Sequence, residues 1–217
     1  MSLPGDLRVV DHVPNSFAKL VSAVAPRSLA LSGGSTARTC YELLATAAAV
    51  DWSDVAVFMS DERWVPVHDP DSNEGMARLA FLDEVEPAAF HSMRNAGPTI
   101  EAAASAYDAL LRESPPIDIV HLGLGPDGHT LSMFPGSPWL DETERLVVAT
   151  GDDLHPHPRL TFTFAAVARS RLAVVTVAGA DKRAALDRVR AGDDLPASRL
   201  RAPEVVWLVD RAAAGLG

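Results

Sequence analysis

Residues 117–136, IDIVHLGLGPDGHTLSMFPG, join an apolar run to a turn that contains three glycines, an aspartate and a histidine. The run at 117–122 is rich in β-branched residues and follows the Pro115-Pro116 break, which predicts a buried strand of a mostly parallel sheet. Gly123, Gly125 and Gly128 then allow the backbone to turn tightly at the carboxyl end of the strand, where open α/β sheets bind their ligands. This stretch therefore predicts an α/β fold with its functional site at the turn.

Asp127 and His129 stand two residues apart in this turn. A carboxylate beside an imidazole is the pair that a general base needs, because the carboxylate fixes the tautomer and stabilises the imidazolium that forms when a proton is taken. The alternative is a surface turn whose histidine has no role. The stretch alone does not separate the two.

The three glycines also spell the G-x-G-x-x-G pattern of dinucleotide-binding folds. Two features argue against that interpretation. Asp127 would place a carboxylate where a pyrophosphate should lie, and Phe134-Pro135-Gly136 leaves room for only about two helical turns after the last glycine. We therefore expect no nucleotide cofactor.

The length and composition predict one globular domain over residues 1–217, because 217 residues with 47% hydrophobic content can bury a sizeable core. No apolar run is long enough to span a bilayer, and the first residues lack the pattern of a signal peptide, so we expect a cytoplasmic protein. The single cysteine, Cys40, is expected to be a small buried residue rather than a nucleophile. A monomer is the default expectation.

The formal net charge of −10 argues against nucleic acid or an acidic membrane as a partner, because either would need a basic face. An anionic small molecule must then be held by local cations. Among the 19 basic residues only Lys19 and Lys182 are lysines. A lysine kept in an arginine-rich chain suggests a place where a compact point charge is needed, which draws attention to Lys182.

A second strand and turn resemble an anion site. Residues 28–32 predict a strand, and Gly33-Gly34-Ser35-Thr36 turns directly into a helix expected over 36–50. Such a turn offers free backbone N–H groups, two hydroxyls and the positive end of a helix dipole, and phosphate is the usual ligand of this arrangement. An ordinary strand-to-helix turn with a Ser/Thr cap is the alternative.

Two further strands end in charged residues. The strand expected at 54–60 leads into Asp61 and Arg63, and the strand at 172–177 leads into a helix over 179–189 whose first turn contains Lys182. The remaining predictions are strands at 7–10, 145–149 and 205–209, and helices at 15–24, 74–82 with Ser72 or Asn73 as its cap, 102–111 and 162–168.

His155 and His157 alternate with prolines in a loop expected at 151–158. An H-x-H pair can bind a metal ion, but no cysteine or carboxylate cluster accompanies this pair, so we expect no metal site. Arg159 follows the loop and is a weaker candidate for the ligand crevice.

Four separated stretches resemble the 6-phosphogluconolactonases, which share a superfamily with the glucosamine-6-phosphate isomerases/deaminases. The stretches are 31–36, LSGGST; 60–66, SDERWVP, with 71–73, DSN; 123–130, GLGPDGHT, through Phe134-Pro135; and 179–182, GADK. Their order and spacing carry the resemblance, which covers nearly the whole chain. Small departures, at Ala37, Leu131 and Met133, leave the polar residues intact.

The resemblance implies a Rossmann-like, three-layer α/β/α sandwich (NagB-like) with a mostly parallel sheet, without cofactor or metal. It implies hydrolysis of 6-phospho-D-glucono-1,5-lactone to 6-phosphogluconate in the oxidative pentose phosphate pathway. By similarity, His129 would activate water and Asp127 would orient the imidazole of His129. The 6-phosphate would be held by Lys182, Arg63, Gly33, Gly34, Ser35 and Thr36, with Arg159 nearby. Arg63 could also stabilise the charge on the carbonyl oxygen, and the role of Asp61 is open.

Two alternatives remain within this resemblance. The isomerases/deaminases carry a carboxylate just before the proline at 135, where this chain has Phe134, and an aromatic residue where it has Arg63. A sugar-phosphate sensor would need the phosphate site but has no reason to keep Asp127 and His129. Ser132 is not expected to be a nucleophile, since G-x-S-x-G is absent.

Overall fold

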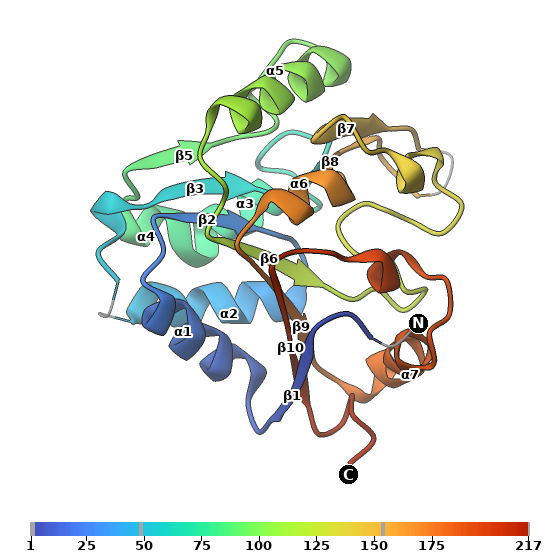
Figure 1. Ribbon diagram of the computed structural model, residues 1–217. Helices are drawn as coiled ribbons and strands as arrows, with labels where there is room; N and C mark the ends of the chain where they lie inside the picture. Colours follow the sequence, from blue (N-terminus) through green and yellow to red (C-terminus); the bar gives the residue numbers. More distant parts are fainter. Residues whose placement is uncertain (1–2, 48–49, 153–154, 217) are drawn as a thin grey trace.

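The structure is a computed structural model that describes residues 3–47, 50–152 and 155–216. A seven-stranded sheet lies at its centre, in the order β1-β10-β9-β6-β2-β3-β5, and every neighbouring pair is parallel (Figure 1). The strands are β1 (Asp6–Val10), β2 (Ser28–Leu31), β3 (Ala56–Met59), β5 (Ala89–His91), β6 (Ile119–Gly123), β9 (Leu172–Val177) and β10 (Glu204–Asp210). The sequence predicted all of these except β5.

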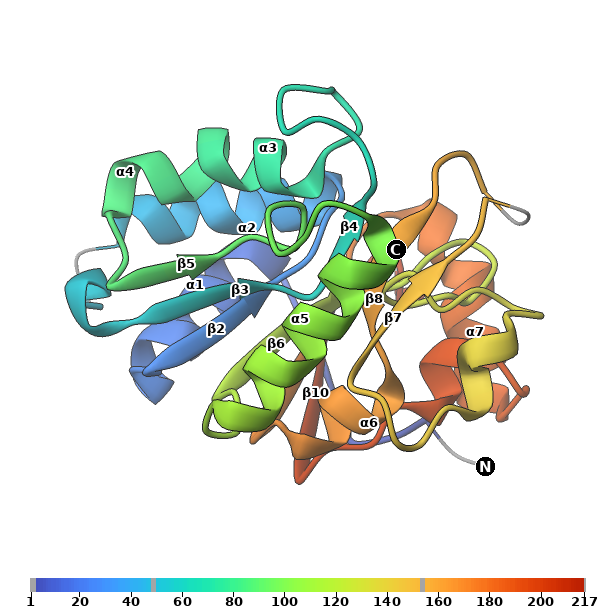
Figure 2. The same ribbon diagram turned by 90° about the horizontal axis from the view of Figure 1, so that it is seen from above.

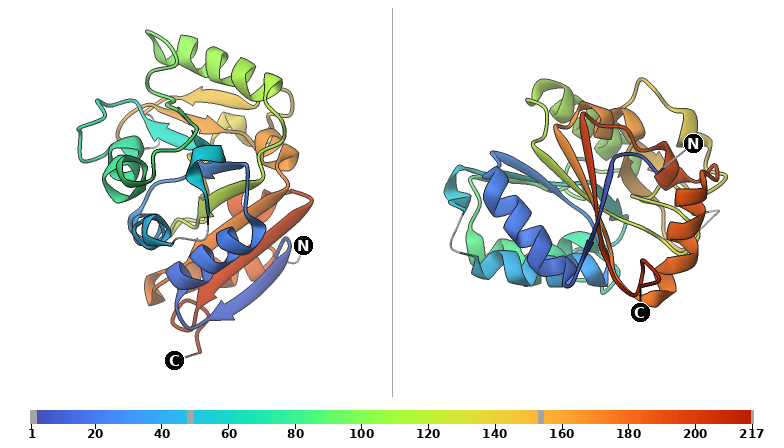
Figure 3. Two further views of the ribbon diagram at one scale, coloured as in Figure 1. Left: turned by 90° about the vertical axis from the view of Figure 1, so that its left-hand side faces the viewer. Right: turned by 60° about the horizontal axis from the view of Figure 1, so that its bottom comes forward.

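Burial explains why these strands could be read from sequence. All six residues of β9 and the first four of β6 are buried, because helices cover both faces of the sheet. Each fully buried valine or leucine contributes roughly 1.5–3 kcal/mol relative to an exposed one, so these strands carry much of the core. β1 is an edge strand with exposed positions, and Figure 3 shows it beside β10 at the rim of the sheet.

The helices form two layers, which confirms the predicted α/β/α sandwich (Figures 1 and 2). One face of the sheet is covered by α1 (Val13–Val24), α2 (Ser35–Thr46), α3 (Asn73–Ala77) and α4 (Asp83–Val85); a π-helical turn, Arg78–Leu82, joins the last two. The other face carries α5 (Ile100–Glu113), α6 (Phe164–Arg169) and α7 (Arg183–Ala191). In the part of the chain described, no helix is long and apolar enough to cross a membrane.

The structure corrects the expected boundaries of two helices. α2 ends at Thr46 rather than at Val50, and residues 48–49 of the expected helix lie outside the described residues. Its buried residues, Ala37, Cys40, Tyr41 and Leu44, follow helical spacing, which explains why Cys40 faces the core. The helix expected at 162–168 begins only at Phe164, because Phe162 belongs to a strand.

That strand is part of a second, antiparallel sheet in the order β4-β8-β7, which the sequence did not predict. Its strands are β4 (Asp61–Arg63), β8 (Arg159–Phe162) and β7 (Val147–Thr150). The backbone of Ser60 joins the two sheets: its N–H donates to Leu31 O at 2.7 Å, and its carbonyl accepts from Phe162 N at 2.8 Å. The partners β4 and β8 lie almost 100 residues apart, so no local pattern reveals their pairing.

The position of the site follows from the strand order. β2 and β6 are neighbours, yet the chain leaves β2 toward α2 on one face and leaves β6 toward the second sheet on the other. Ligands bind where the connections of an open α/β sheet diverge in this way, at the carboxyl ends of the strands. The turns after β2 and β6 therefore flank one crevice.

A buried polar chain ties three of these strands together behind the crevice. His121 in β6 is bonded through Nδ1 to the Tyr41 hydroxyl at 2.8 Å and through Nε2 to the Thr176 hydroxyl at 2.9 Å. The Tyr41 oxygen also accepts from Ser32 N at 2.8 Å, at the end of β2. Burial lowers the pKa of His121 to about 3, so the ring is neutral inside the core.

We expect the free energy of unfolding to fall as the pH drops below about 6.5, the ordinary histidine pKa, because the unfolded chain then takes up a proton that folded His121 refuses. The folded pKa lies below the unfolded value, so this stability is complete above pH ~6.5 and is lost below it, by at most about 1.4 kcal/mol per pH unit. Urea unfolding between about pH 7 and pH 5 measures this. His121→Asn should flatten the dependence, and an equally steep curve in that variant would contradict the assignment.

Candidate active site

A cavity of ≈ 200 Å³ lies at the carboxyl ends of β2, β3, β6 and β9. Seven of the predicted site residues line it: Gly33, Gly34, Asp61, Arg63, His129, Arg159 and Lys182. Its other lining residues are Ser32, Asn73, Gly123, Leu124, Gly125, Pro126, Thr130 and Leu131. Asp127 lies behind His129, and Ser35 and Thr36 continue from Gly34 into α2 without lining the cavity.

The turn after β6 holds the predicted carboxylate–imidazole pair. Gly125 N donates to His129 O at 2.8 Å and Gly128 N donates to Gly125 O at 3.0 Å, with Gly128 at φ +89°, where a side chain would be strained. This closed turn places Asp127 Oδ1 2.5 Å from His129 Nδ1 and 3.1 Å from the backbone N–H of His129. The two side chains therefore form one rigid unit.

Close approach explains why residue 125 is glycine. A Cβ atom added at Gly125 would lie 2.1 Å from His129 Nδ1 and 2.8 Å from Asp127 Oδ1. The imidazole and the carboxylate thus pack directly against the Gly125 backbone. Any larger residue there would separate the pair.

The environment keeps this histidine neutral with one nitrogen available. Burial lowers the pKa of His129, although the charges of Asp127 and Asp61 act in the opposite direction. The pKa of Asp127 is also lowered, because hydrogen bonds from His129 and its charge outweigh the opposing effect of burial. Asp127 is then an acceptor, so Nδ1 carries the proton and Nε2 keeps its lone pair. Among the described residues, no group hydrogen-bonds to Nε2.

Two arginines stand side by side in the cavity. Arg63 in β4 and Arg159 in β8 are directly paired residues of an antiparallel ladder, so their side chains leave the same face. Burial and the charge of Arg63 both lower the pKa of Arg159. Like charges at such a position repel, and an anion between them would remove the repulsion.

Lys182 adds a third cation to the cavity. It lies in a 3-10 turn, Ala180–Lys182, just before α7, which agrees with its predicted place in the first helical turn after β9. Its side chain is 25% exposed, and Nζ is 3.6 Å from Asp181. The cavity therefore contains three cationic side chains although the chain as a whole carries a net charge of −10.

The turn after β2 has the geometry expected for binding an anion. Gly34 precedes the 12-residue helix α2 at φ +103°, and no side chain caps the helix. A Cβ atom at Gly34 would meet nothing within 4 Å. The backbone N–H groups of Ser35 and Thr36 have no acceptor among the described residues, so they remain available at the positive end of the helix.

Asp61 and Ser132 form a buried pair that sequence reasoning left without a role. Ser132 Oγ donates to Asp61 Oδ2 at 2.8 Å, and Ser132 N donates to the Thr161 hydroxyl at 3.1 Å. Ser132 is fully buried, which fits the expectation that it is not a nucleophile. Burial lowers the pKa of His129, and the charge of Asp61 partly opposes that effect.

Sequence reasoning also missed Glu62 and Asn73, whose partners lie about ten residues away along the chain. Glu62 is buried and accepts hydrogen bonds from the 72–74 turn. Asn73 accepts from Arg63 Nη1 at 2.7 Å. The only signal was their presence in the quoted motifs, because no periodicity marks a buried carboxylate in a turn.

The remaining candidates are the two loop histidines and Cys40, and of these His155 lies near the base, with its ring centroid 6.1 Å from that of His129. His157 Nε2 is 3.1 Å from Asp71 Oδ2, whereas the ring of His155 packs against Phe134 at 3.7 Å between centroids. The two histidines thus have different partners, and in the described ranges no group of three His, Cys, Asp or Glu residues could hold a metal ion. Cys40 is buried, and burial raises its pKa to about 12.

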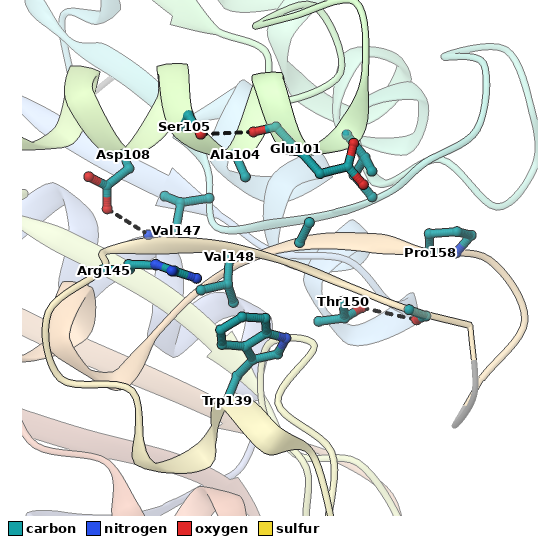
Figure 4. A pocket seen from close by; sticks show the side chains of 13 residues that line it. Glu101, Ala104, Ser105, Asp108, Trp139, Arg145, Val147, Val148, Thr150 and Pro158 are labelled. Carbon is teal, nitrogen blue, oxygen red and sulfur yellow. Dashed lines mark hydrogen bonds between the residues drawn. The ribbon is translucent and has the colours of Figure 1, made fainter.

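A larger groove of ≈ 650 Å³ lies between α5 and β7, where Trp139 and Val148 line it together with Arg145 (Figure 4). Two acidic residues, Glu101 and Asp108, line it, and Asp108 already accepts hydrogen bonds from Leu146 N and from Val147 N. None of the predicted site residues lines this groove.

The family model for glucosamine-6-phosphate isomerases/6-phosphogluconolactonase matches residues 7–207. The chain belongs to this family. A curated 6-phosphogluconolactonase from Synechocystis sp. is 40% identical over 213 residues, covering 90% of this chain and 88% of the relative. One from Mycobacterium leprae is 37% identical over 215 residues, covering 89% of this chain and 87% of the relative.

Solved structures of family members match the architecture. A 6-phosphogluconolactonase from Thermotoga maritima superposes with a TM-score of 0.84 at 26% identity, covering 94% of this chain and 99% of the other. One from Shewanella baltica gives a TM-score of 0.81 at 30% identity, covering 97% and 99%. The predicted fold and the resemblance to this family are therefore confirmed.

We expect Asp127→Asn to lower the pKa of His129 further. Burial disfavours the imidazolium, and the charge of Asp127 is the main effect that opposes burial. The pKa is measured by NMR titration of the imidazole protons. Asp181→Asn is the matched control, since Asp181 pairs with Lys182, and it should leave the pKa of His129 unchanged. A rise, or no change, in Asp127→Asn would show that the carboxylate does not act on His129.

Proposed function

We propose that this protein is a hydrolase that opens the ester bond of 6-phospho-D-glucono-1,5-lactone to give 6-phospho-D-gluconate, a step of the oxidative pentose phosphate pathway. The observation that carries the proposal is the free Nε2 of the Asp127-paired His129, which shares one cavity with Arg63, Arg159 and Lys182. A base and three cations in one cavity suit a reacting carbonyl and a phosphate on the same molecule. The names of the curated relatives support the same activity.

The reaction follows from the protonation state of His129. Nε2 takes a proton from water as the water oxygen attacks the lactone carbonyl carbon, and the carbonyl π electrons move onto its oxygen. When the tetrahedral intermediate collapses, the bond to the ring oxygen breaks and the imidazolium returns its proton to that oxygen. Asp127, which accepts from Nδ1, stabilises the imidazolium between the two steps.

The cations divide into two tasks. The phosphate is held by Arg159, Lys182 and the backbone N–H groups after Gly34, which together offset its two negative charges. Arg63 reaches the same phosphate and also stabilises the charge that grows on the carbonyl oxygen. Asp61 acts electrostatically, since its carboxylate favours the imidazolium form of His129.

Phe134 favours this reaction over deamination of an amino sugar phosphate. The isomerase/deaminase pattern places a carboxylate at this position, whereas here an aromatic ring lies 4.5 Å from the His129 ring centroid. No carboxylate from that position can assist ring opening. The similarity to a monomeric glucosamine-6-phosphate deaminase, at 20% identity and a TM-score of 0.83, shows the shared fold alone.

A single chain is sufficient for this chemistry. Every group named above comes from one copy of the chain, so we propose that the protein acts as a monomer. We place it in the cytoplasm with a small sugar phosphate as its partner, and its acidic net charge disfavours nucleic acid. Light scattering after size exclusion measures the oligomeric state directly.

The activity is tested by following freshly made 6-phosphogluconolactone with EDTA present, against its spontaneous hydrolysis. We expect a clear acceleration of lactone loss, because a positioned base and a phosphate clamp need no metal ion for this step. Glucosamine 6-phosphate should release no ammonia in a parallel assay. Tight binding of 6-phosphogluconate without acceleration would instead indicate a sensor.

His129→Ala and Lys182→Ala should separate catalysis from binding. Loss of the base is expected to lower kcat by about 10² to 10⁴-fold and to leave the affinity for 6-phosphogluconate nearly intact. Loss of the lysine is expected mainly to raise KM, by roughly tenfold, as for a hydrogen bond to a charged group. Steady-state kinetics and calorimetric binding measure both effects. Wild-type kcat in His129→Ala would refute the general-base role.

A further inference from the structure

We infer that Glu62 is a positioning residue: its buried carboxylate orders the 72–74 turn and thereby fixes Arg63 through Asn73. Glu62 itself does not line the cavity, and only 1% of its surface is exposed. The inference rests on the proposed function in one respect, namely that Arg63 binds the substrate. The geometry that links the three residues does not depend on that activity.

The carboxylate of Glu62 accepts four hydrogen bonds. Oε1 accepts from the backbone N–H groups of Arg63 and Asn73, each at 2.7 Å. Oε2 accepts from Glu74 N at 2.6 Å and from Ser72 Oγ at 3.1 Å. Glu62 therefore binds the free N–H groups at the start of α3, where a negative charge is favoured.

The ordered turn then fixes the position of the Arg63 side chain. The Oδ1 atom of Asn73 accepts from Arg63 Nη1 at 2.7 Å, and Asp71 O accepts from the same nitrogen at 2.8 Å. Asn73 Nδ2 donates to Asp61 O at 3.0 Å, which fixes the amide orientation. The guanidinium is thus held by two acceptors that both belong to the loop that Glu62 orders.

Asn73 also connects this loop to the turn after β2. A Cβ atom added at Gly33 would lie 1.9 Å from Asn73 Oδ1, so the amide packs directly on the Gly33 backbone. The acceptor of the Arg63 hydrogen bond therefore touches the start of the anion-binding turn. Displacing Asn73 would move Arg63 and loosen its contact with that turn.

The requirement is for a carboxylate and not only for a side chain of this size. A glutamine would present an amino group to one pair of donors, and three of the four donors are backbone N–H groups, which cannot accept. Its best orientation keeps the bonds of Oε1 and loses the one from Glu74 N. Burial raises the pKa of Glu62 to about 7. All four hydrogen bonds have the carboxylate as acceptor, so they act in the opposite direction and favour the ionised form.

Glu62→Gln tests the inference, with Arg63→Ala and the double variant. We expect Glu62→Gln to lower kcat/KM and to weaken competitive inhibition by inorganic phosphate, each about tenfold, the size expected when a buried hydrogen bond to a charged group is lost. In the Arg63→Ala background the same change should cost less than about twofold, because its effect passes through Arg63. If Glu62 had a merely structural role, the loss of kcat/KM in Glu62→Gln would multiply with the loss in Arg63→Ala.

Glu74→Gln is the matched control. Glu74 is also a buried carboxylate of α3, but it bonds Arg78 and Ser92 and does not line the cavity. We expect it to lower Tm while kcat/KM stays within about twofold of wild type. Asn73→Ala keeps Glu62 and should reproduce the effect on kcat/KM, which preserves the test if Glu62→Gln does not fold.

Three outcomes would overturn the inference: an unchanged kcat/KM in folded Glu62→Gln, full multiplicativity with Arg63→Ala, or an equal loss in Glu74→Gln. Failure of the proposed function has a different signature, because the wild-type protein would then not accelerate lactone hydrolysis. In that case calorimetric binding of inorganic phosphate to wild type and Glu62→Gln still tests the positioning. Equal affinities would reject it.

Discussion

The hydrogen bond between Asp127 Oδ1 and His129 Nδ1 depends on the glycine turn at the end of β6. β6 is buried and rigid, and the chain leaves it through three glycines, one of which lies against the imidazole itself. The pair is therefore preorganised before any ligand arrives, and Nε2 of the neutral ring is available as a hydrogen-bond acceptor. Because β2 ends beside β6, the same strand ends that hold the base also present the helix N-terminus to the ligand.

Electrostatics explains how an acidic protein can bind an anionic substrate. The net charge of −10 would repel a phosphorylated sugar at long range, and salt in the cell screens much of that repulsion. Inside the cavity the balance is reversed by Arg63, Arg159 and Lys182. The direct pairing of two arginines across β4 and β8 is unfavourable by itself, which supports the proposal that a phosphate binds between them.

The second sheet explains how the two arginines reach the cavity. β4 follows β3 after the single residue Ser60, so Arg63 is carried away from the main sheet and toward β8. Glu62 lies between Asp61 and Arg63, where its side chain turns inward to the loop before α3. In the proposed mechanism, adjacent residues of one short strand thus supply a charge beside the base, a positioning carboxylate and a substrate-binding cation.

Local sequence patterns revealed the parts of this protein that local physics determines. The strands buried on both faces, the glycine turns and the position of Lys182 after β9 all follow from periodicity and turn chemistry, and the structure has them. The pairing of β4 with β8 and the hydrogen bonds of Glu62 join residues distant in sequence, so no window of the chain contains their cause. Phe162 was placed in a helix for the same reason: its partner, Val147, lies in another element.

An experimental structure of the complex with 6-phospho-D-gluconate tests the proposed site most directly. We expect the phosphate within hydrogen-bond distance of Arg63, Arg159 and Lys182, beside the N-terminus of α2. We also expect one water to link the C1 carboxylate to His129 Nε2, at about 2.6–3.2 Å from each, because the neutral Nε2 and a carboxylate are both acceptors. A phosphate bound at His129, or a ligand in the groove between α5 and β7, would contradict the proposal.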